Sequence, residues 1–79
     1  MTEAETLLEQ VREFRKKKRE TVRALKKARA PRSHILDIEV QINNAVAMFE
    51  AFLCFRNMGE LGYAAEHKQK LEQALDNSH

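Results

Sequence analysis

The sequence predicts an all-α protein: an antiparallel two-helix hairpin followed by a short third helix. Charged residues make up 33% and hydrophobic residues 43% of the chain, which has only two Gly and one Pro. Such a composition is typical of helical hairpins and coiled coils. Apolar residues recur every three or four positions, and this spacing breaks at Pro31 and Gly59. We therefore expect one domain over residues 1–79, with helices at about 3–30, 34–58 and 63–76.

The first helix has a clear start and one apolar side. Thr2 and Glu5 have the spacing of a capping box, in which each side chain accepts a hydrogen bond from the other residue's amide. Lys18 interrupts the apolar side, and its stem must lie on the core while its ammonium reaches water. The residues expected to contact the second helix are Leu7, Val11, Phe14, Val22 and Leu25.

The second helix is the most informative segment because it carries two apolar faces. Pro31 ends the first helix, and Ser33 is a candidate N-cap for the second. A connection this short predicts antiparallel neighbours. At about 100° per residue, one face is suited to the first helix; it consists of Ile35, Ile38, Ile42, Ala45, Val46, Phe49, Phe52 and Leu53. The second apolar face lies nearly opposite; it consists of Leu36, Val40, Met48, Ala51, Cys54, Phe55 and Met58.

The second apolar face predicts contact with another chain. One neighbouring helix cannot cover two opposite stripes, and chains of this size often complete their core by association. The alternative is that the third helix folds back over Cys54, Phe55 and Met58, although it is too short to reach Leu36 and Val40. We expect its packing to be weak, because it is rich in Ala and interrupted by Lys68. The predicted partner interface consists of Leu36, Val40, Met48, Ala51, Phe55 and Met58.

Positive charge is concentrated in the first helix. Residues 12–32 contain eleven Lys or Arg against two Glu, whereas the whole chain has a net charge of only +2. A basic face can contact an acidic protein or a nucleic acid. The sequence lacks a zinc pattern, a zipper and an aromatic platform, which disfavours nucleic acid. A nucleic-acid-associated protein that uses this helix remains the alternative function. The candidate electrostatic contacts are Arg15, Lys16, Arg19 and Arg23.

The residue types that carry chemistry show no catalytic, metal or cofactor pattern. No two of His34, His67 and His79 have the spacing of a helical metal site, and Cys54 has no companion ligand nearby in sequence. We expect neither an enzyme nor a cofactor. The acidic N-terminus is unlike a secretory signal, and the apolar run 45–55 is short for a membrane span. These features predict a cytoplasmic protein without a membrane partner.

In size and pattern the chain resembles the small co-chaperones of type III secretion needle subunits from bacterial pathogens. The resemblance covers roughly residues 5–55: a charged first helix, the turn Pro31 to Ser33, and the segment LDIEVQINNAVAMFEAFL. It implies a cytosolic hairpin that binds a larger helical-repeat chaperone, and through it holds a needle subunit monomeric. The chain departs from the family in its stronger basic run and longer C-terminal segment. Whether the free chain forms homo-oligomers stays open.

Overall fold

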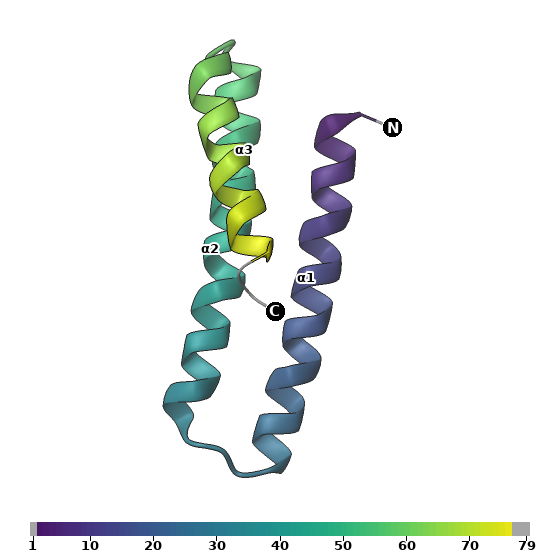
Figure 1. Cartoon of the computed structure of the whole chain (residues 1–79), viewed down its shortest axis with the longest axis vertical. Coiled ribbons are helices and arrows are strands. Elements are labelled where there is room, and N and C mark those ends of the chain that lie inside the picture. Colours follow the sequence, from purple (N-terminus) through teal and green to yellow (C-terminus); the bar gives the residue numbers. More distant parts are fainter. Residues whose placement is uncertain (1, 77–79) are drawn as a thin grey trace.

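Three α-helices account for nearly all of residues 2–76, which are the residues that the computed structural model describes. They are α1 (Glu3–Lys27), α2 (Arg32–Asn57) and α3 (Leu61–Asp76), and this range contains no strand. The all-α prediction is confirmed. α1 and α2 run side by side in opposite directions, and α3 turns back along α2 (Figure 1). The predicted domain also includes Met1 and residues 77–79, which lie outside the described residues.

The N-terminus of α1 is capped by one of the two hydrogen bonds of the predicted capping box. The amide of Glu5 donates to the Thr2 hydroxyl at 3.2 Å, which satisfies one amide that the helix itself leaves unpaired. Glu3 and Glu5 lie in the first turn, where their carboxylates interact favourably with the positive end of the helix dipole.

α1 ends at Lys27, three residues before its predicted end. Arg29 adopts a left-handed backbone with φ of 54°. Its amide donates to the Lys26 carbonyl, and the Ala30 amide donates to the Leu25 carbonyl at 3.0 Å. These two bonds form a Schellman motif, a helix terminus that usually places Gly where Arg29 stands. The terminus was missed because the sequence shows no glycine there.

α2 begins immediately after Pro31 rather than after Ser33. The predicted Ser33 N-cap is wrong: Pro31 occupies the N-cap position, and no side chain caps the helix. The fixed φ of proline, here −55°, already suits a residue that leads into a helix. α2 ends in a second Schellman motif, in which Gly59 has a φ of 80° and the Glu60 amide donates to the Phe55 carbonyl. Here the sequence does supply the expected glycine.

The core is concentrated where all three helices overlap. α1 and α2 meet through most of the residues that the apolar spacing predicts, although Phe14, Leu25 and Ile38 are only half-buried. Phe49 and Phe52 lie 6.5 Å apart, centroid to centroid. The buried residues that pack into one cluster are Leu7, Val11, Ala45, Phe49, Phe52, Ala64 and Leu71.

α3 packs firmly on α2, and the expectation of weak packing is wrong. α2 makes more extensive contact with α3 than with α1, whereas α1 and α3 barely meet. Leu71 has no exposed surface and Ala64 is 3% exposed. The small side chain of Ala64 lets the two helices approach closely, so the alanines that seemed a weakness favour tight packing.

α3 covers only part of α2 and so divides the molecule into two ends. At about 1.5 Å per residue, the 16 residues of α3 span about 24 Å and the 26 of α2 about 39 Å. We call the part with α3 the three-helix end, and the part near the α1–α2 turn the two-helix end (Figure 1). Val22 and Ile42 are buried outside the main core cluster and extend the α1–α2 contact toward the two-helix end.

By length and composition alone, α2 could span a membrane. The sequence expectation was based on the apolar run 45–55, which is too short to span a membrane, whereas the whole helix is long enough. Core helices of soluble proteins meet the same criterion. In this structure α2 is the central helix, and both of its neighbours pack on it.

Candidate protein-binding surface

An apolar stripe remains exposed along the side of α2 that points away from α1. Val40 and Cys54 are about four turns apart on one side of the helix, and neither lies on the side formed by the buried Ile42 and Phe49. Leu36 is 45%, Val40 54% and Met58 66% exposed. The outer stripe, as we call it, consists of Leu36, Val40, Ala47, Cys54 and Met58.

Three residues of the predicted partner interface are half-covered within the chain. Met48 and Phe55 pack against the core cluster, and Ala51 is half-buried. The Phe55 ring lies 5.4 Å from Tyr63 and 5.0 Å from His67, centroid to centroid. This corrects the expectation that the whole second apolar face is free, because α3 folds over one side of it.

The exposed members of the predicted interface are therefore Leu36, Val40 and Met58. Only under the alternative, in which the third helix folds back over Cys54, Phe55 and Met58, would Met58 be shielded. It is instead the most exposed, and its sulfur contacts the Cys54 sulfur at 3.9 Å. Leu36 and Val40 lie beyond the reach of α3, as their distance from it in the sequence predicts.

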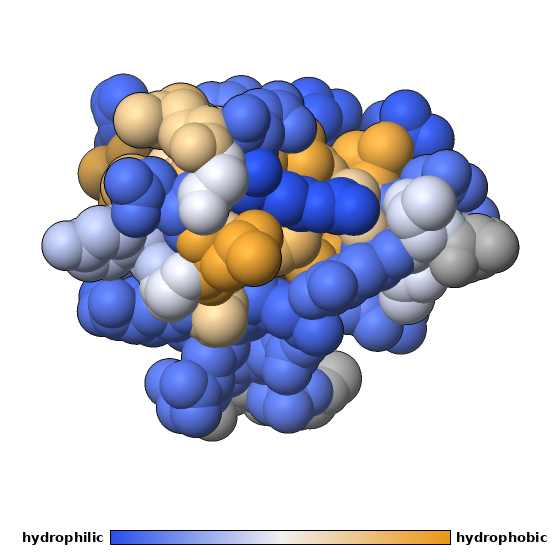
Figure 2. Space-filling model, turned by 90° about the horizontal axis from the view of Figure 1, so that it is seen from above, coloured by the Kyte–Doolittle hydropathy of each residue, from blue (hydrophilic) through white to orange (hydrophobic). Residues whose placement is uncertain are grey.

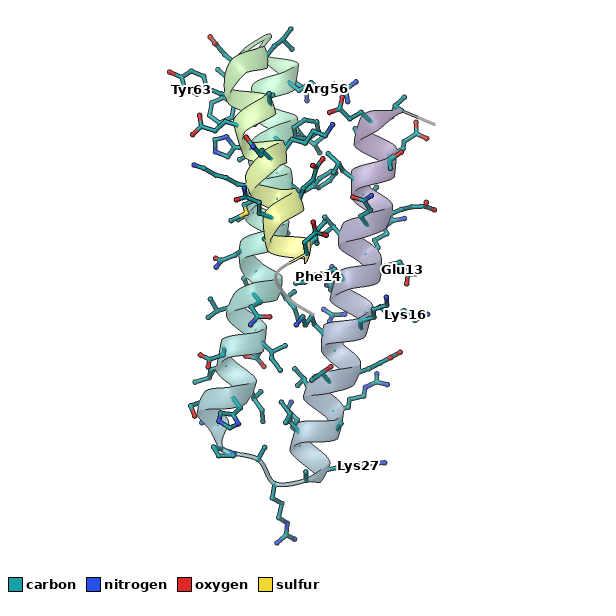
Figure 3. The ribbon with its side chains drawn as sticks, in the orientation of Figure 1. Glu13, Phe14, Lys16, Lys27, Arg56 and Tyr63 are labelled. Atoms are coloured by element: carbon teal, nitrogen blue, oxygen red, sulfur yellow. The ribbon has the colours of Figure 1, made fainter. Side chains whose placement is uncertain are left out.

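More apolar surface lies at the tip of the three-helix end. Leu61 is 69% and Tyr63 56% exposed, close in sequence to Met58. Figure 2 looks down on this end and shows hydrophobic side chains at the surface among hydrophilic ones. Neither Leu61 nor Tyr63 was predicted to be part of an exposed surface. Their position beside Gly59 and Gly62, where the chain turns, could have indicated it. Figure 3 shows the Tyr63 side chain pointing away from α1.

Acidic residues border the outer stripe. Asp37, Glu39 and Glu50 are exposed on α2, and none of them forms an ion pair with another described residue. The opposite edge of the molecule is basic, because α1 carries most of the Lys and Arg residues. The two edges therefore offer chemically different surfaces: one is apolar with an acidic border, and the other is cationic.

The candidate electrostatic contacts Arg15, Lys16, Arg19 and Arg23 are all exposed on α1. Figure 3 shows Lys16 reaching away from α2. Lys18 differs from them: it is half-buried, and its ammonium lies 5.6 Å from the centre of the Phe14 ring. The half-buried side chain agrees with the expectation that its stem lies on the core.

One ion pair links α1 to α3. The Lys68 ammonium lies 2.7 Å from the Glu3 carboxylate. Through their hydrogen bond, Lys68 lowers the pKa of Glu3, and Glu3 raises the pKa of Lys68. Lys68, which was expected to interrupt the packing of α3, instead connects its first half to the start of α1.

Two open clefts lie between α1 and α3, with volumes of about 870 and 490 Å³. Charged side chains line both, including Glu13 and Lys17 in the larger and Arg56 in the smaller. Among the described residues no polar side chain is buried, so the clefts lack the fixed polar groups that orient small ligands. No three His, Cys, Asp or Glu side chains in residues 2–76 gather as metal ligands.

Cys54 is a free, exposed cysteine on the outer stripe. No protein-family model matches the chain, and searches of curated proteins and of solved structures give no match either.

Proposed function

We propose that this chain is a non-enzymatic protein-binding module, a cytoplasmic co-chaperone of bacterial type III secretion. In this proposal it acts as a helical hairpin with a short third helix. It pairs with a larger helical-repeat chaperone, and together they hold a needle subunit. The observation that carries the protein-binding role is the outer stripe: its three large residues stay 45–66% exposed after the chain has folded.

Energetics support a partner for this stripe. Full burial of a Leu, Val or Met side chain contributes roughly 1.5–3 kcal/mol. About half of that is left unrealised at Leu36, Val40 and Met58, so a partner gains roughly 2–5 kcal/mol by covering them. A row of anchors along one helix suits the groove of a helical protein. Helical-repeat proteins present extended concave surfaces of this kind.

The acidic border gives the partner a recognisable chemistry. A groove with an apolar floor and basic rims complements Asp37, Glu39 and Glu50 around the outer stripe. Such a rim adds to the rate and specificity of association more than to its strength. The apolar anchors supply most of the affinity.

Pull-down from the native host tests the proposal. Tagged wild-type chain should recover a larger helical chaperone together with a needle subunit. Val40→Asp should recover neither, because the complex would bury an unpaired carboxylate. The folding of the variant should stay intact, since Val40 is already 54% exposed.

Gln41→Asp is the matched control. It places the same charge on the neighbouring exposed residue, away from the outer stripe, and should recover both partners. If Val40→Asp recovers them as well as wild type does, the outer stripe is not the interface. If wild type recovers proteins of another kind, the secretion role fails even where the stripe proves to be the interface.

A further inference from the structure

α1 carries a second extended surface that the outer stripe does not use. Its helical periodicity places seven Lys and Arg side chains on one flank, which begins beside the buried Val22 and extends outward from it. All seven are exposed. The basic flank, as we call it, consists of Arg12, Arg15, Lys16, Arg19, Arg23, Lys26 and Lys27.

The positive charge of this flank is not neutralised within the folded chain. The ion pairs among residues 2–76 join Lys68 to Glu3 and Glu72, and Lys70 to Glu66. None of them involves the basic flank. In Figure 3, Lys16 and Lys27 extend outward from α1, away from α2. The cations of the flank are therefore available to an outside ligand.

The composition of the flank indicates the class of that ligand. Between residues 12 and 27 it contains no apolar or aromatic side chain, since Val22, Leu25 and Phe14 face the core. It thus has no anchor of the kind that dominates protein interfaces, and nothing to insert into a bilayer. Exposed ion pairs with protein carboxylates contribute little. Neutralising nucleic-acid phosphates, in contrast, releases condensed counterions and yields substantial affinity from charge alone.

The spacing of the charges fits a phosphate backbone. Residues 12–27 span about 22 Å of helix, so the seven cations follow one another on average about every 4 Å along its axis. One strand of a duplex carries a phosphate about every 3.4 Å of its axis, so the two linear charge densities are comparable and opposite in sign. The chain lacks the zinc, zipper and aromatic patterns of proteins that recognise a specific base sequence. Binding to the phosphate backbone alone requires none of them.

We propose that the basic flank of α1 binds the phosphate backbone of a nucleic-acid duplex without regard to its sequence. This activity is separate from the proposed co-chaperone role. The two surfaces lie on opposite edges of the molecule, so one can fail without the other.

Fluorescence anisotropy of the whole chain with a labelled DNA duplex of about 20 base pairs tests this proposal at several salt concentrations between about 50 and 200 mM. Two duplexes of unrelated sequence should bind alike. The logarithm of the association constant should fall linearly with the logarithm of salt concentration. Combining Arg15→Gln, Lys16→Gln, Arg19→Gln and Arg23→Gln should reduce the slope by about 3–4, roughly 0.9 for each phosphate that the variant no longer neutralises.

The controls separate charge position from charge number and from folding. Gln is a good helix former, so circular dichroism should show the same helicity in the variant. Arg56→Gln with Lys70→Gln removes two cations outside the basic flank and should leave the slope nearly unchanged. Binding that ignores salt, or a fourfold variant that binds like wild type, would overturn the proposal. So would binding only to anionic vesicles or to an acidic peptide.

Discussion

The two ends of this molecule are built from the same pair of helices but differ in how well those helices are covered. At the three-helix end α2 lies between α1 and α3, and the main core cluster is there. At the two-helix end α2 has only α1 beside it. Val22 and Ile42 are buried there, while Ile38 and Leu25 are half-buried and Leu36 and Val40 are exposed.

The difference teaches what a third helix supplies to a small helical chain. A helix with two apolar faces needs two neighbours, and α3 provides the second one for only part of the length of α2. The remainder is left with apolar surface that no described residue covers. The main core cluster therefore lies at one end of α2, whereas the exposed Leu36 and Val40 lie at the other.

The largest expected effect comes from emptying the core of the three-helix end. Phe49→Ala should lower the free energy of unfolding by about 3–5 kcal/mol, because it removes a buried ring from the main cluster. Val22→Ala, the counterpart nearer the two-helix end, should cost only about 1–2 kcal/mol, since it removes two methylene equivalents. Urea denaturation measures both; a loss at Val22 as large as that at Phe49 would mean that the two-helix end is the more tightly packed.

A smaller loss should follow from weakening the packing of α3. Leu71→Ala should cost about 2–5 kcal/mol, because Leu71 is fully buried against the core cluster. Leu61→Ala changes the same residue type in the same helix at a 69% exposed site, and should change stability by less than about 0.5 kcal/mol. Thermal or urea unfolding distinguishes them. Similar effects would show that α3 is only loosely attached.

The two Schellman motifs allow a comparison of helix ends, in which each substitution should change the free energy of unfolding by about 1 kcal/mol. Gly59→Ala should destabilise by about 1 kcal/mol, since φ of 80° strains any residue with a Cβ. Arg29→Gly should stabilise by about 0.5–1 kcal/mol, because it relieves the same strain in the α1–α2 turn. Chemical denaturation measures the loss of stability in the first variant and the gain in the second. A loss of stability in Arg29→Gly would show that the arginine side chain has a role that outweighs the strain.

The smallest effect should be the pH dependence of the Glu3–Lys68 ion pair. Because Lys68 lowers the pKa of Glu3, this pair stabilises the fold above the ordinary Glu value of 4.5, and the gain disappears as pH falls through the lowered pKa. The raised pKa of Lys68 keeps its contribution complete below 10.5, and it is lost as pH rises through the folded-state value.

Melting temperatures of wild type and Glu3→Gln measure this effect. Wild type should melt slightly higher at neutral pH, and the two curves should converge in acid. Because both side chains are solvent-exposed, the gap should also narrow as salt rises. A gap that persists below the lowered pKa of Glu3 would have a cause other than the ion pair.

The parts of the fold that follow from local spacing could be predicted from the sequence. The Thr2 cap, the side of α1 that carries Leu7 and Val11, and the position of Lys18 over the core all depend on residues within a few turns. The end of α1 could not be predicted, because Arg29 adopts a left-handed backbone conformation that is uncommon for arginine.

The candidate site was predicted only in part, for a tertiary reason. Helical periodicity identifies an apolar face on α2, but it cannot say how much of that face α3 covers. The docking of Phe55 against Tyr63 and His67 depends on the α2–α3 turn that Gly59 creates. Leu36 and Val40 are exposed because α3 is too short to reach them, as the sequence predicts.

Native-state amide hydrogen exchange on the free chain tests the contrast between the two ends most directly. Exchange from a region reports the free energy of opening it, and buried contacts raise that free energy. Amides of α2 in residues 45–57, which α3 covers, should exchange more slowly than those in residues 34–44, after correction for intrinsic rates and omitting the frayed first and last turns. Uniform protection along α2, or slower exchange at residues 34–44, would contradict this account.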